Sequence, residues 1–252
     1  MSDTPPPIQR SGPMDFYTRI VPLTVEDHGG WGLDPAQRNQ GFCRDAVFIP
    51  LMTGEFISAA LDYPIIFMGD QHQPMAVVGL DGIGNLFVDN DVWDAKAYVP
   101  GFVRRHPFLL ASQPASPDKM AICIDEGVAA LHADGAGQRL FDDAGKPAPI
   151  LAEAVALLEY FEGLRRHSEI IVKLLLKHEL ITTRTLKSEA SDAPAATFES
   201  VSEERLAALG PAVLAELRDA QALGPIYAQL ISLQNWPRLV QRAHARLAAR
   251  GA

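Results

Sequence analysis

The 252-residue chain changes character near residue 150. Before that point Gly, Pro, Val, Ile and Phe alternate with turn-forming residues, which is typical of short strands joined by turns. After it Ala, Leu, Glu and Arg dominate, and apolar residues recur at helical spacing. The change predicts an α+β fold. We expect an irregular β-rich body with an antiparallel or mixed sheet over residues 14–145, and a helical region over 150–250 packed on it.

The length of the chain permits one large domain or two small ones. We expect residues 14–252 to form a single domain, and the alternative is two modules joined near residue 145. Residues 1–13 are predicted to be a flexible leader, since acids and prolines stand where a signal peptide would need a basic start and an apolar run. The expected location is therefore the cytoplasm, and the alternative is the cell surface, reached by an export route that needs no signal peptide.

Composition excludes several classes of protein. The formal net charge of −9 argues against a nucleic-acid binder, because phosphate contacts need clustered Lys and Arg. The chain has no run of about 18 uninterrupted apolar residues, so we expect a soluble protein without a membrane span. Cys43 and Cys123 lie far apart in the sequence. They could form a disulfide bridge, but the favoured interpretation is two reduced core residues.

The first half contains several short apolar runs that we interpret as strands. Two of them flank Asp81–Gly84, where glycines allow the positive φ of a tight turn, so the pair predicts a β-hairpin. A helical turn or two is expected between the second and third strands, over Leu51–Leu61. The predicted strands are Phe16–Leu23, Ala46–Pro50, Tyr63–Met68, Met75–Leu80, Asn85–Val88 and Met120–Asp125.

In the second half, apolar residues from Ile150 to Leu175 predict a long helix, which Gly163 divides or bends. Lys187–Thr197 is interpreted as a polar connection. Ser200–Glu203 has the spacing of a capping box and predicts the start of a short helix. The last helix is expected over Pro225–Ala249, where its arginines would complement the helix dipole.

Arg104, Arg105 and His106 form the most distinctive candidate site. Two adjacent arginines in a loop can hold a carboxylate or phosphate through bidentate hydrogen bonds. Trp93 and Tyr98 would provide an aromatic surface beside them, although both are equally good core residues. The alternative is that one arginine braces the fold by pairing with an acid, for which the candidates are Asp62, Asp89 and Asp94.

Evidence for catalysis or for a metal is weak. The seven histidines show neither HxH nor HExxH spacing. Asp70 and His72 are the most suggestive pair for a metal, and the alternative is a solvated loop. Glu55 and Glu126 lie among apolar residues, but nothing in the sequence places them near each other. No nucleophile motif occurs and no cofactor can be identified, so the sequence leans away from an enzyme.

Six motifs in order carry a family resemblance: PLMTGEF, YPIIF, NLFVDNDVWDAKAYVPGFVRRHPF, AICID, SEERL and LGPIYAQLISLQNWPRL. This succession resembles the SapC family of bacterial proteins, and the resemblance runs from about Pro22 to Leu239. Val92 stands where a glycine commonly precedes the tryptophan, and His106 where a tyrosine commonly follows the two arginines. The resemblance implies a bacterial accessory or surface-layer-associated protein without an established reaction.

Three functions follow as hypotheses. The leading one is a soluble accessory protein that binds a partner protein or a small anionic ligand, as a helper in nutrient uptake, surface-layer or modification systems. The second is a metal-dependent enzyme that uses Asp70, His72 or His106. The third is a structural component of a surface layer. A homo-oligomer is compatible with all three.

Overall fold

The structure is a computed structural model that describes residues 16–113, 116–188 and 191–251. The leader expected over residues 1–13 lies outside this range. The chain divides into two compact units, each built from two separate stretches. Unit 1 comprises residues 1–42 and 103–161, and unit 2 comprises residues 43–102 and 162–252.

The predicted α+β fold is confirmed. Every strand pair among the described residues is antiparallel, and helices dominate the chain beyond β15. Helix α4, over Pro149–Lys177, contributes its first part to unit 1 and its remainder to unit 2. It runs through Gly163 without a break, so the predicted division there is wrong. A glycine inside a helix costs only about 1 kcal/mol, which burial of the apolar face of α4 offsets.

Unit 1 contains two three-stranded sheets. The first has the order β1-β11-β10 and the second β12-β2-β13. One short helix, α1, follows β1. The bounds are β1 Ile20–Pro22, α1 Val25–His28, β2 Gly32–Leu33, β10 Phe108–Gln113, β11 Ser116–Asp125, β12 Leu131–His132 and β13 Gln138–Arg139.

The core of unit 1 joins these sheets to the first part of α4. Leu151 and Leu158 are buried from the helix, two turns apart, while Phe108 and Ile124 are buried from β10 and β11. Leu33, Ala130, Leu140 and Phe141 complete the cluster. Each fully buried side chain of this kind contributes roughly 1.5–3 kcal/mol. Burial of these side chains therefore fixes β10 and β11, and with them the loops at the ends of these two strands.

Unit 2 is built on a five-stranded sheet of order β14-β15-β4-β5-β3. Two small hairpins follow the sheet strand β5, and the first of them, β6–β7, confirms the turn predicted at Asp81–Gly84. The bounds are β3 Phe48–Pro50, β4 Ile65–Met68, β5 Gln73–Val77, β6 Gly79–Leu80, β7 Gly84–Asn85, β8 Val88–Asp89, β9 Val92–Trp93, β14 Ile181–Ser188 and β15 Ser191–Val201.

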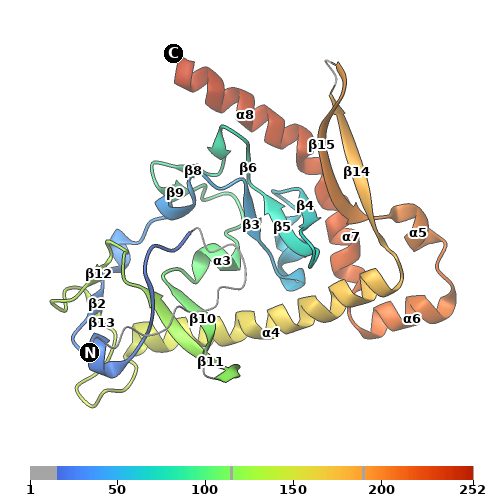
Figure 1. The fold of residues 1–252 in the computed structure, drawn as a ribbon. Coiled ribbons are helices and arrows are strands. Elements are labelled where there is room, and N and C mark those ends of the chain that lie inside the picture. The colour runs from blue at the N-terminus through green and yellow to red at the C-terminus, as the bar shows by residue number, and fades with distance from the viewer. Residues whose placement is uncertain (1–15, 114–115, 189–190, 252) are drawn as a thin grey trace, which may run out of the picture. The chain divides into compact units, whose positions relative to one another are not determined.

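The interpretation of Lys187–Thr197 as a polar connection is wrong. The described residues of this stretch, 187–188 and 191–197, belong to the long strands β14 and β15, which are drawn in orange in Figure 1. This strand pair is anchored at its base, where Ile181 pairs with Val201 and Arg184 with Phe198. The backbone ladder that starts there continues through Pro-containing, polar sequence, because pairing with a neighbouring strand outweighs weak β propensity.

The helices of unit 2 also differ from prediction in two places. Ser202, and not Ser200, caps α5: its Oγ accepts a hydrogen bond from the Arg205 amide at 3.3 Å, while Ser200 lies in β15. The helix predicted over Pro225–Ala249 is interrupted by a 3-10 turn at Leu233–Asn235. The bounds are α2 Phe56–Ala59, α5 Glu203–Ala207, α6 Pro211–Asp219, α7 Leu223–Ser232 and α8 Trp236–Gly251. The short helix α3, Gly101–Arg104, has its first two residues in unit 2 and its last two in unit 1.

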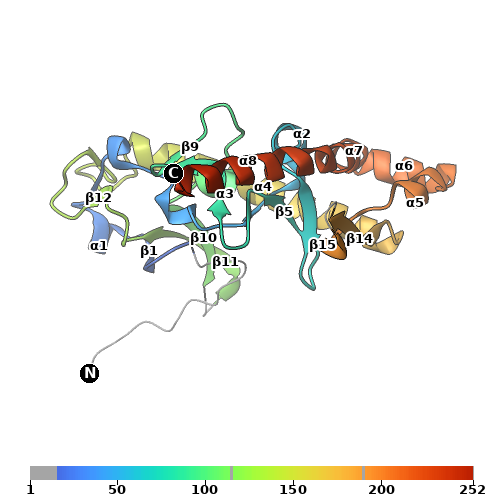
Figure 2. The same cartoon turned by 90° about the horizontal axis from the view of Figure 1, so that it is seen from above.

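A buried polar network explains the interruption between α7 and α8. The Gln229 amide donates to the Ile65 carbonyl at 2.8 Å and accepts from the Val201 amide at 3.1 Å. Ser232 Oγ accepts from the Ile65 amide at 2.9 Å, and Asn235 donates to the Ala60 carbonyl at 2.7 Å. These bonds tie α7 to β4 and β15 and to the end of α2, which lies beside α7 (Figure 2).

Replacing Gln229 with alanine is expected to lower the free energy of unfolding by about 3 kcal/mol, because it leaves a buried carbonyl at Ile65 and a buried amide at Val201 without partners. Urea denaturation followed by circular dichroism measures the change. Gln234→Ala, at an exposed position on the adjacent turn, is the matched control and should change stability by less than about 0.5 kcal/mol. Equal effects of the two substitutions would refute the role given to the network.

The arginines of α8 make specific contacts within unit 2. Arg242 lies over the Phe87 ring, 4.3 Å from its centroid, and pairs with Asp94 at 2.9 Å. Three others, one or two turns away along the same helix, donate to backbone carbonyls. They are Arg238 to Leu61, Arg246 to Val88 and Arg250 to Ile83. This row attaches the last helix to the segment between α2 and β9.

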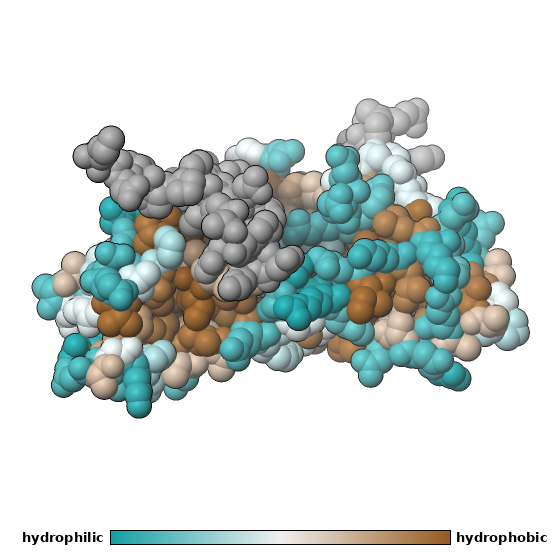
Figure 3. Space-filling view, turned by 60° about the horizontal axis from the view of Figure 1, so that its bottom comes forward, coloured by the Kyte–Doolittle hydropathy of each residue, from teal (hydrophilic) through white to brown (hydrophobic). Residues whose placement is uncertain are grey.

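Apolar side chains also reach the surface. Figure 3 shows brown, apolar patches interleaved with hydrophilic residues on the face that it presents. On α7 and in and just after α2, four large side chains are more than half exposed: Ile57, Leu61, Tyr227 and Ile231. None of the described helices combines the length and the apolar character needed to cross a membrane.

Candidate functional site

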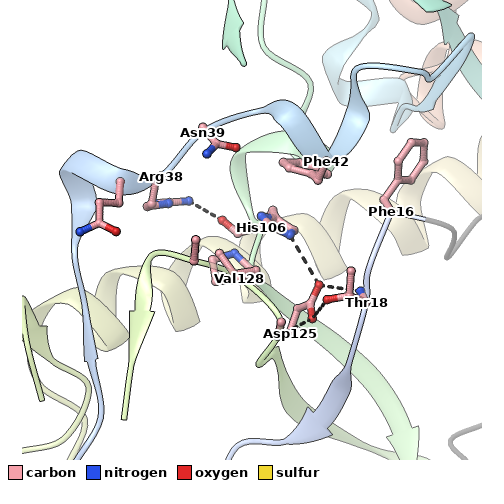
Figure 4. Close-up of a pocket in the computed structure, with 12 residues that line it drawn as sticks. Phe16, Thr18, Arg38, Asn39, Phe42, His106, Asp125 and Val128 are labelled. Atoms are coloured by element: carbon pink, nitrogen blue, oxygen red, sulfur yellow. Dashed lines mark hydrogen bonds and ion pairs between the residues drawn. The ribbon is translucent and has the colours of Figure 1, made fainter. Parts of the chain in front are cut away.

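Unit 1 contains a pocket of about 190 Å³. It lies where four segments meet: the approach to β1, the loop that leads into the 3-10 turn around Phe42, the loop after α3, and the end of β11 (Figure 4). An apolar cavity of about 150 Å³ holds a benzene ring, so this pocket has room for a single-ring molecule. The lining residues that matter below are Phe16, Thr18, Arg38, Phe42, His106 and Asp125.

Arg38 is positioned by a short capped turn. The Asp34 carboxylate accepts from the Ala36 amide at 3.0 Å and starts the 3-10 helix Pro35–Gln37, which ends at Arg38. Nη2 of Arg38 then donates to the backbone carbonyls of Arg104 at 3.1 Å and of His106 at 2.5 Å. The guanidinium thus fixes the loop after α3, and its Nε and Nη1 groups have no hydrogen-bond partner among the described residues.

Asp125, the last residue of β11, is the polar centre of the site. Its carboxylate accepts hydrogen bonds from the Thr18 amide at 2.8 Å, the Thr18 hydroxyl at 2.8 Å, the Arg19 amide at 2.7 Å and the Gly127 amide at 3.1 Å. Burial alone would raise its pKa, but the contacts from His106, Thr18 and Arg19 outweigh burial and hold the pKa of Asp125 well below its usual range. Asp125 is therefore a fixed negative charge.

The His106 ring lies between aromatic side chains. It stacks on Phe42 with a centroid distance of 3.8 Å and an interplanar angle of 15°, and Tyr17 lies 5.4 Å away. Its Nε2 atom is 3.8 Å from Asp125 Oδ2, which is too long for a hydrogen bond, and it is buried with no hydrogen-bond partner among the described residues. Burial lowers the pKa of His106, while Asp125 opposes that shift.

Two further cations influence this ring. The charges of Arg38 and Arg105 both disfavour protonation of His106 and so contribute to its lowered pKa. Burial raises the pKa of Tyr17, and the positive charge of Arg105 opposes that shift. Arg38 is hydrogen-bonded to two neutral backbone carbonyls, and none of the described acids forms an ion pair with it.

The residues expected from the sequence are divided between the two units. Arg104, Arg105 and His106 lie in unit 1, where the Arg104 guanidinium sits over the Phe161 ring at 5.2 Å. Trp93 and Tyr98 belong to unit 2.

Both aromatic residues have partners within unit 2. Trp93 is buried, and its Nε1 donates to the Tyr63 hydroxyl at 3.2 Å. The Tyr98 hydroxyl donates to Glu55 at 2.9 Å. Two of the three acids considered as braces for the arginines have partners within unit 2, since Asp62 accepts from the Tyr98 amide and Asp94 pairs with Arg242.

Metal-binding side chains do not converge in the part of the chain that the structure describes, where no group of three or more His, Cys, Asp or Glu residues has the arrangement to hold an ion. His72, with Asp70 one of the two metal candidates, pairs through Nδ1 with Glu199 at 2.8 Å. Cys43 and Cys123 are free, buried thiols, and burial raises their pKa values to about 12 and about 11.

Sequence reasoning missed most of the pocket. His106 was found from the Arg-Arg-His-Pro motif, but Arg38, Phe42 and Thr18 belong to stretches without a motif. Asp125 carried one usable signal, an acid that ends the apolar run AICID. An acid in that position is expected to find hydrogen-bond donors at the strand end, because burying it unpaired would be costly.

The comparisons with known proteins confirm the family resemblance. The SapC family model matches residues 23–239, a range that contains Arg38, Phe42, His106 and Asp125. No curated protein and no solved structure matches the chain. Because the matched range covers most of the sequence, the chain belongs to the SapC family.

Proposed function

We propose that this SapC-family chain is a binding protein that holds a small organic molecule in the His106 pocket. The observation that carries the proposal is the buried Nε2 atom of His106, which has no hydrogen-bond partner among the described residues. A buried polar atom of this kind costs free energy, and because His106 lines a pocket a bound molecule can offset that cost. A ligand that orders the ring and draws it toward Asp125 would supply one.

The pocket suits a small molecule better than a protein surface. It is concave, one wall is formed by Phe16 and Phe42, and a few polar groups converge on it, as in ordinary ligand sites. We infer that the accessory role implied by the family, as a helper in uptake or modification of a nutrient, is exercised through capture of such a ligand.

Binding is favoured over catalysis by the arrangement around His106. In a hydroxyl-based catalytic site the nucleophile would face the imidazole. Here the Thr18 hydroxyl donates to Asp125 at 2.8 Å. Thr18 therefore stabilises the carboxylate, and the described residues of the pocket supply no activated nucleophile.

Ligand-observed NMR with single-ring probes tests the proposal. We expect at least one of benzyl alcohol, benzylamine, benzamide and benzoate to give a saturation-transfer signal with the wild type. Ala129 lines the rim of the pocket and is exposed, so Ala129→Trp fills the pocket with little effect on the core. The signal should disappear in this variant.

Ala133→Trp is the matched control, since Ala133 is exposed in the same unit and lies outside the pocket lining. It should retain the signal. If no probe binds the wild type, or if Ala129→Trp binds as well as Ala133→Trp, the pocket is not the binding site.

A further inference from the structure

We infer that the ligand of this pocket is a compact, ring-bearing carboxylate, and that His106 binds it as an imidazolium with Arg38 beside it. The inference rests on the proposed function and names the chemical class of the ligand. It also has a consequence that can be measured without knowing the natural ligand: capture should take up a proton from solvent.

The charges around the pocket support an anion. His106 is faced by Asp125 at the end of β11, by Arg38 from the 3-10 turn, by Arg105 from its own loop and by the neutral Tyr17 hydroxyl from the segment before β1. The one carboxylate of this set already accepts four hydrogen bonds from amide and hydroxyl donors. Its charge is thus well compensated, whereas Arg38 is hydrogen-bonded only to neutral backbone carbonyls among the described residues, so its positive charge is left for an anionic ligand to balance.

The orientation of the imidazole supports a second hydrogen-bond partner. Nε2 is turned toward Asp125, as the dashed line in Figure 4 marks. The two N–H bonds of an imidazolium diverge, so a ring held by Asp125 through Nε2 presents Nδ1 on another side. A small movement of the ring would close the 3.8 Å gap to Asp125, and Nδ1–H would then donate to a ligand carboxylate.

Arg38 provides the second anchor. Both hydrogens of its Nη2 group are directed to the carbonyls of Arg104 and His106, which holds the guanidinium plane in place. Its Nε and Nη1 groups remain to donate to an anion, and a pre-positioned guanidinium loses little freedom when it does so. Phe42 lies stacked on the imidazole and, with Phe16, offers apolar surface for the ring of the ligand.

Proton uptake follows from the state of His106 before binding. Its lowered pKa keeps the ring largely neutral at neutral pH in the empty pocket. A bound carboxylate stabilises the imidazolium and raises that pKa. Affinity should therefore be highest in mildly acidic solution. Above the pKa of the free ring it should fall by up to about tenfold per pH unit.

Isothermal titration calorimetry with benzoate and with its neutral isostere benzamide tests the charge class. At a pH of about 6 we expect benzoate to bind at least tenfold more tightly, since a hydrogen bond to a charged group is much stronger than one to a neutral group. If benzamide binds as tightly as benzoate, the pocket binds small molecules, as proposed, but the assignment of an anion is wrong. If neither binds, and the other single-ring probes do not bind either, the proposed function itself fails.

Titration of benzoate in buffers with different ionisation enthalpies measures the proton. At a pH of about 7.5 we expect an uptake approaching one proton per benzoate in the wild type, which requires no variant. An uptake of zero together with an affinity that is constant from pH 6 to 8 would overturn the assignment of the imidazolium.

His106→Gln keeps an amide donor but cannot take up a proton. It should weaken benzoate binding at least tenfold at a pH of about 6 and abolish both the proton uptake and the pH dependence. His132→Gln is the control, because His132 also has a buried Nε2 in unit 1 but lies outside the pocket lining. It should behave as the wild type. Retention of proton uptake in a folded His106→Gln variant would contradict the inference.

Discussion

Replacing Asp125 with alanine is expected to lower the free energy of unfolding by about 3–5 kcal/mol, the largest effect of any single change considered for unit 1. The substitution removes one carboxylate and leaves the amides of Thr18, Arg19 and Gly127 without their acceptor. It also detaches the segment before β1 from the end of β11. Chemical denaturation measures the loss.

The control for this change is Asp134→Ala. Asp134 also accepts an amide hydrogen bond, from Ala136 at 3.1 Å, but it is exposed in a turn of the same unit. Asp134→Ala should lower the free energy of unfolding by less than about 1 kcal/mol. A loss at Asp125 no larger than at Asp134 would show that the carboxylate does not organise the site.

The contribution of Asp125 to the free energy of unfolding should decrease as the pH is lowered. Its pKa is lowered in the folded state, so its stabilising contribution is present above the unfolded value of 3.8 and is lost as pH falls through the folded value. The difference in stability between the wild type and Asp125→Asn should therefore shrink as the pH is lowered below about 4. A difference that stays constant between pH 7 and pH 3 would contradict the assigned charge.

Replacing Glu55 with alanine is the second change with a large expected effect, a loss of about 3 kcal/mol in unit 2. Glu55 is 4% exposed, and its carboxylate accepts from the Met52 amide at 2.9 Å, the Tyr98 hydroxyl at 2.9 Å and the Gly101 amide at 2.6 Å. Removing it takes the Glu55 acceptor away from three donors. Glu55→Gln should lower the free energy of unfolding by less than Glu55→Ala does. The glutamine NH2 group would face the Met52 amide, donor against donor, while the glutamine oxygen would still accept the bonds from Tyr98 and Gly101.

Glu204→Ala, at an exposed position in α5, serves as the control and should be nearly neutral. Glu55 joins two of the motifs that carry the family resemblance through one buried carboxylate: PLMTGEF and the AYVPGF part of NLFVDNDVWDAKAYVPGFVRRHPF. If Glu55→Ala is as stable as Glu204→Ala, this explanation of why the two motifs occur together is wrong.

The sequence correctly predicted elements that depend on residues close to one another along the chain. The apolar spacing of α4 and the glycine turn between β6 and β7 were read correctly from the sequence. The position of Glu55 among apolar residues indicated a buried acid, but its partners at Tyr98 and Gly101 lie more than forty residues away and could not be identified. The sequence pattern therefore indicated that Glu55 is a buried acid but did not show which residues it contacts.

The errors have a common physical cause in tertiary contacts. Polar, Pro-containing sequence continues the β14–β15 ladder because its base is already paired. The break between α7 and α8 places Ser232 and Asn235 against β4 and the end of α2, and no helix signal in the sequence marks it. In the same way, Arg38 and Asp125 lie 68 and 19 residues from His106, so only the folded chain assembles the pocket.

The most direct test of the central claim is native mass spectrometry of three proteins purified gently and in parallel from their own host cells: the wild type, Ala129→Trp and Ala133→Trp. We expect a stoichiometric small-molecule mass on the wild type and on Ala133→Trp, and its loss from Ala129→Trp, because only that variant fills the His106 pocket. Wild-type protein without any bound mass, or equal occupancy of the two tryptophan variants, would contradict the claim that this SapC-family protein captures its ligand there.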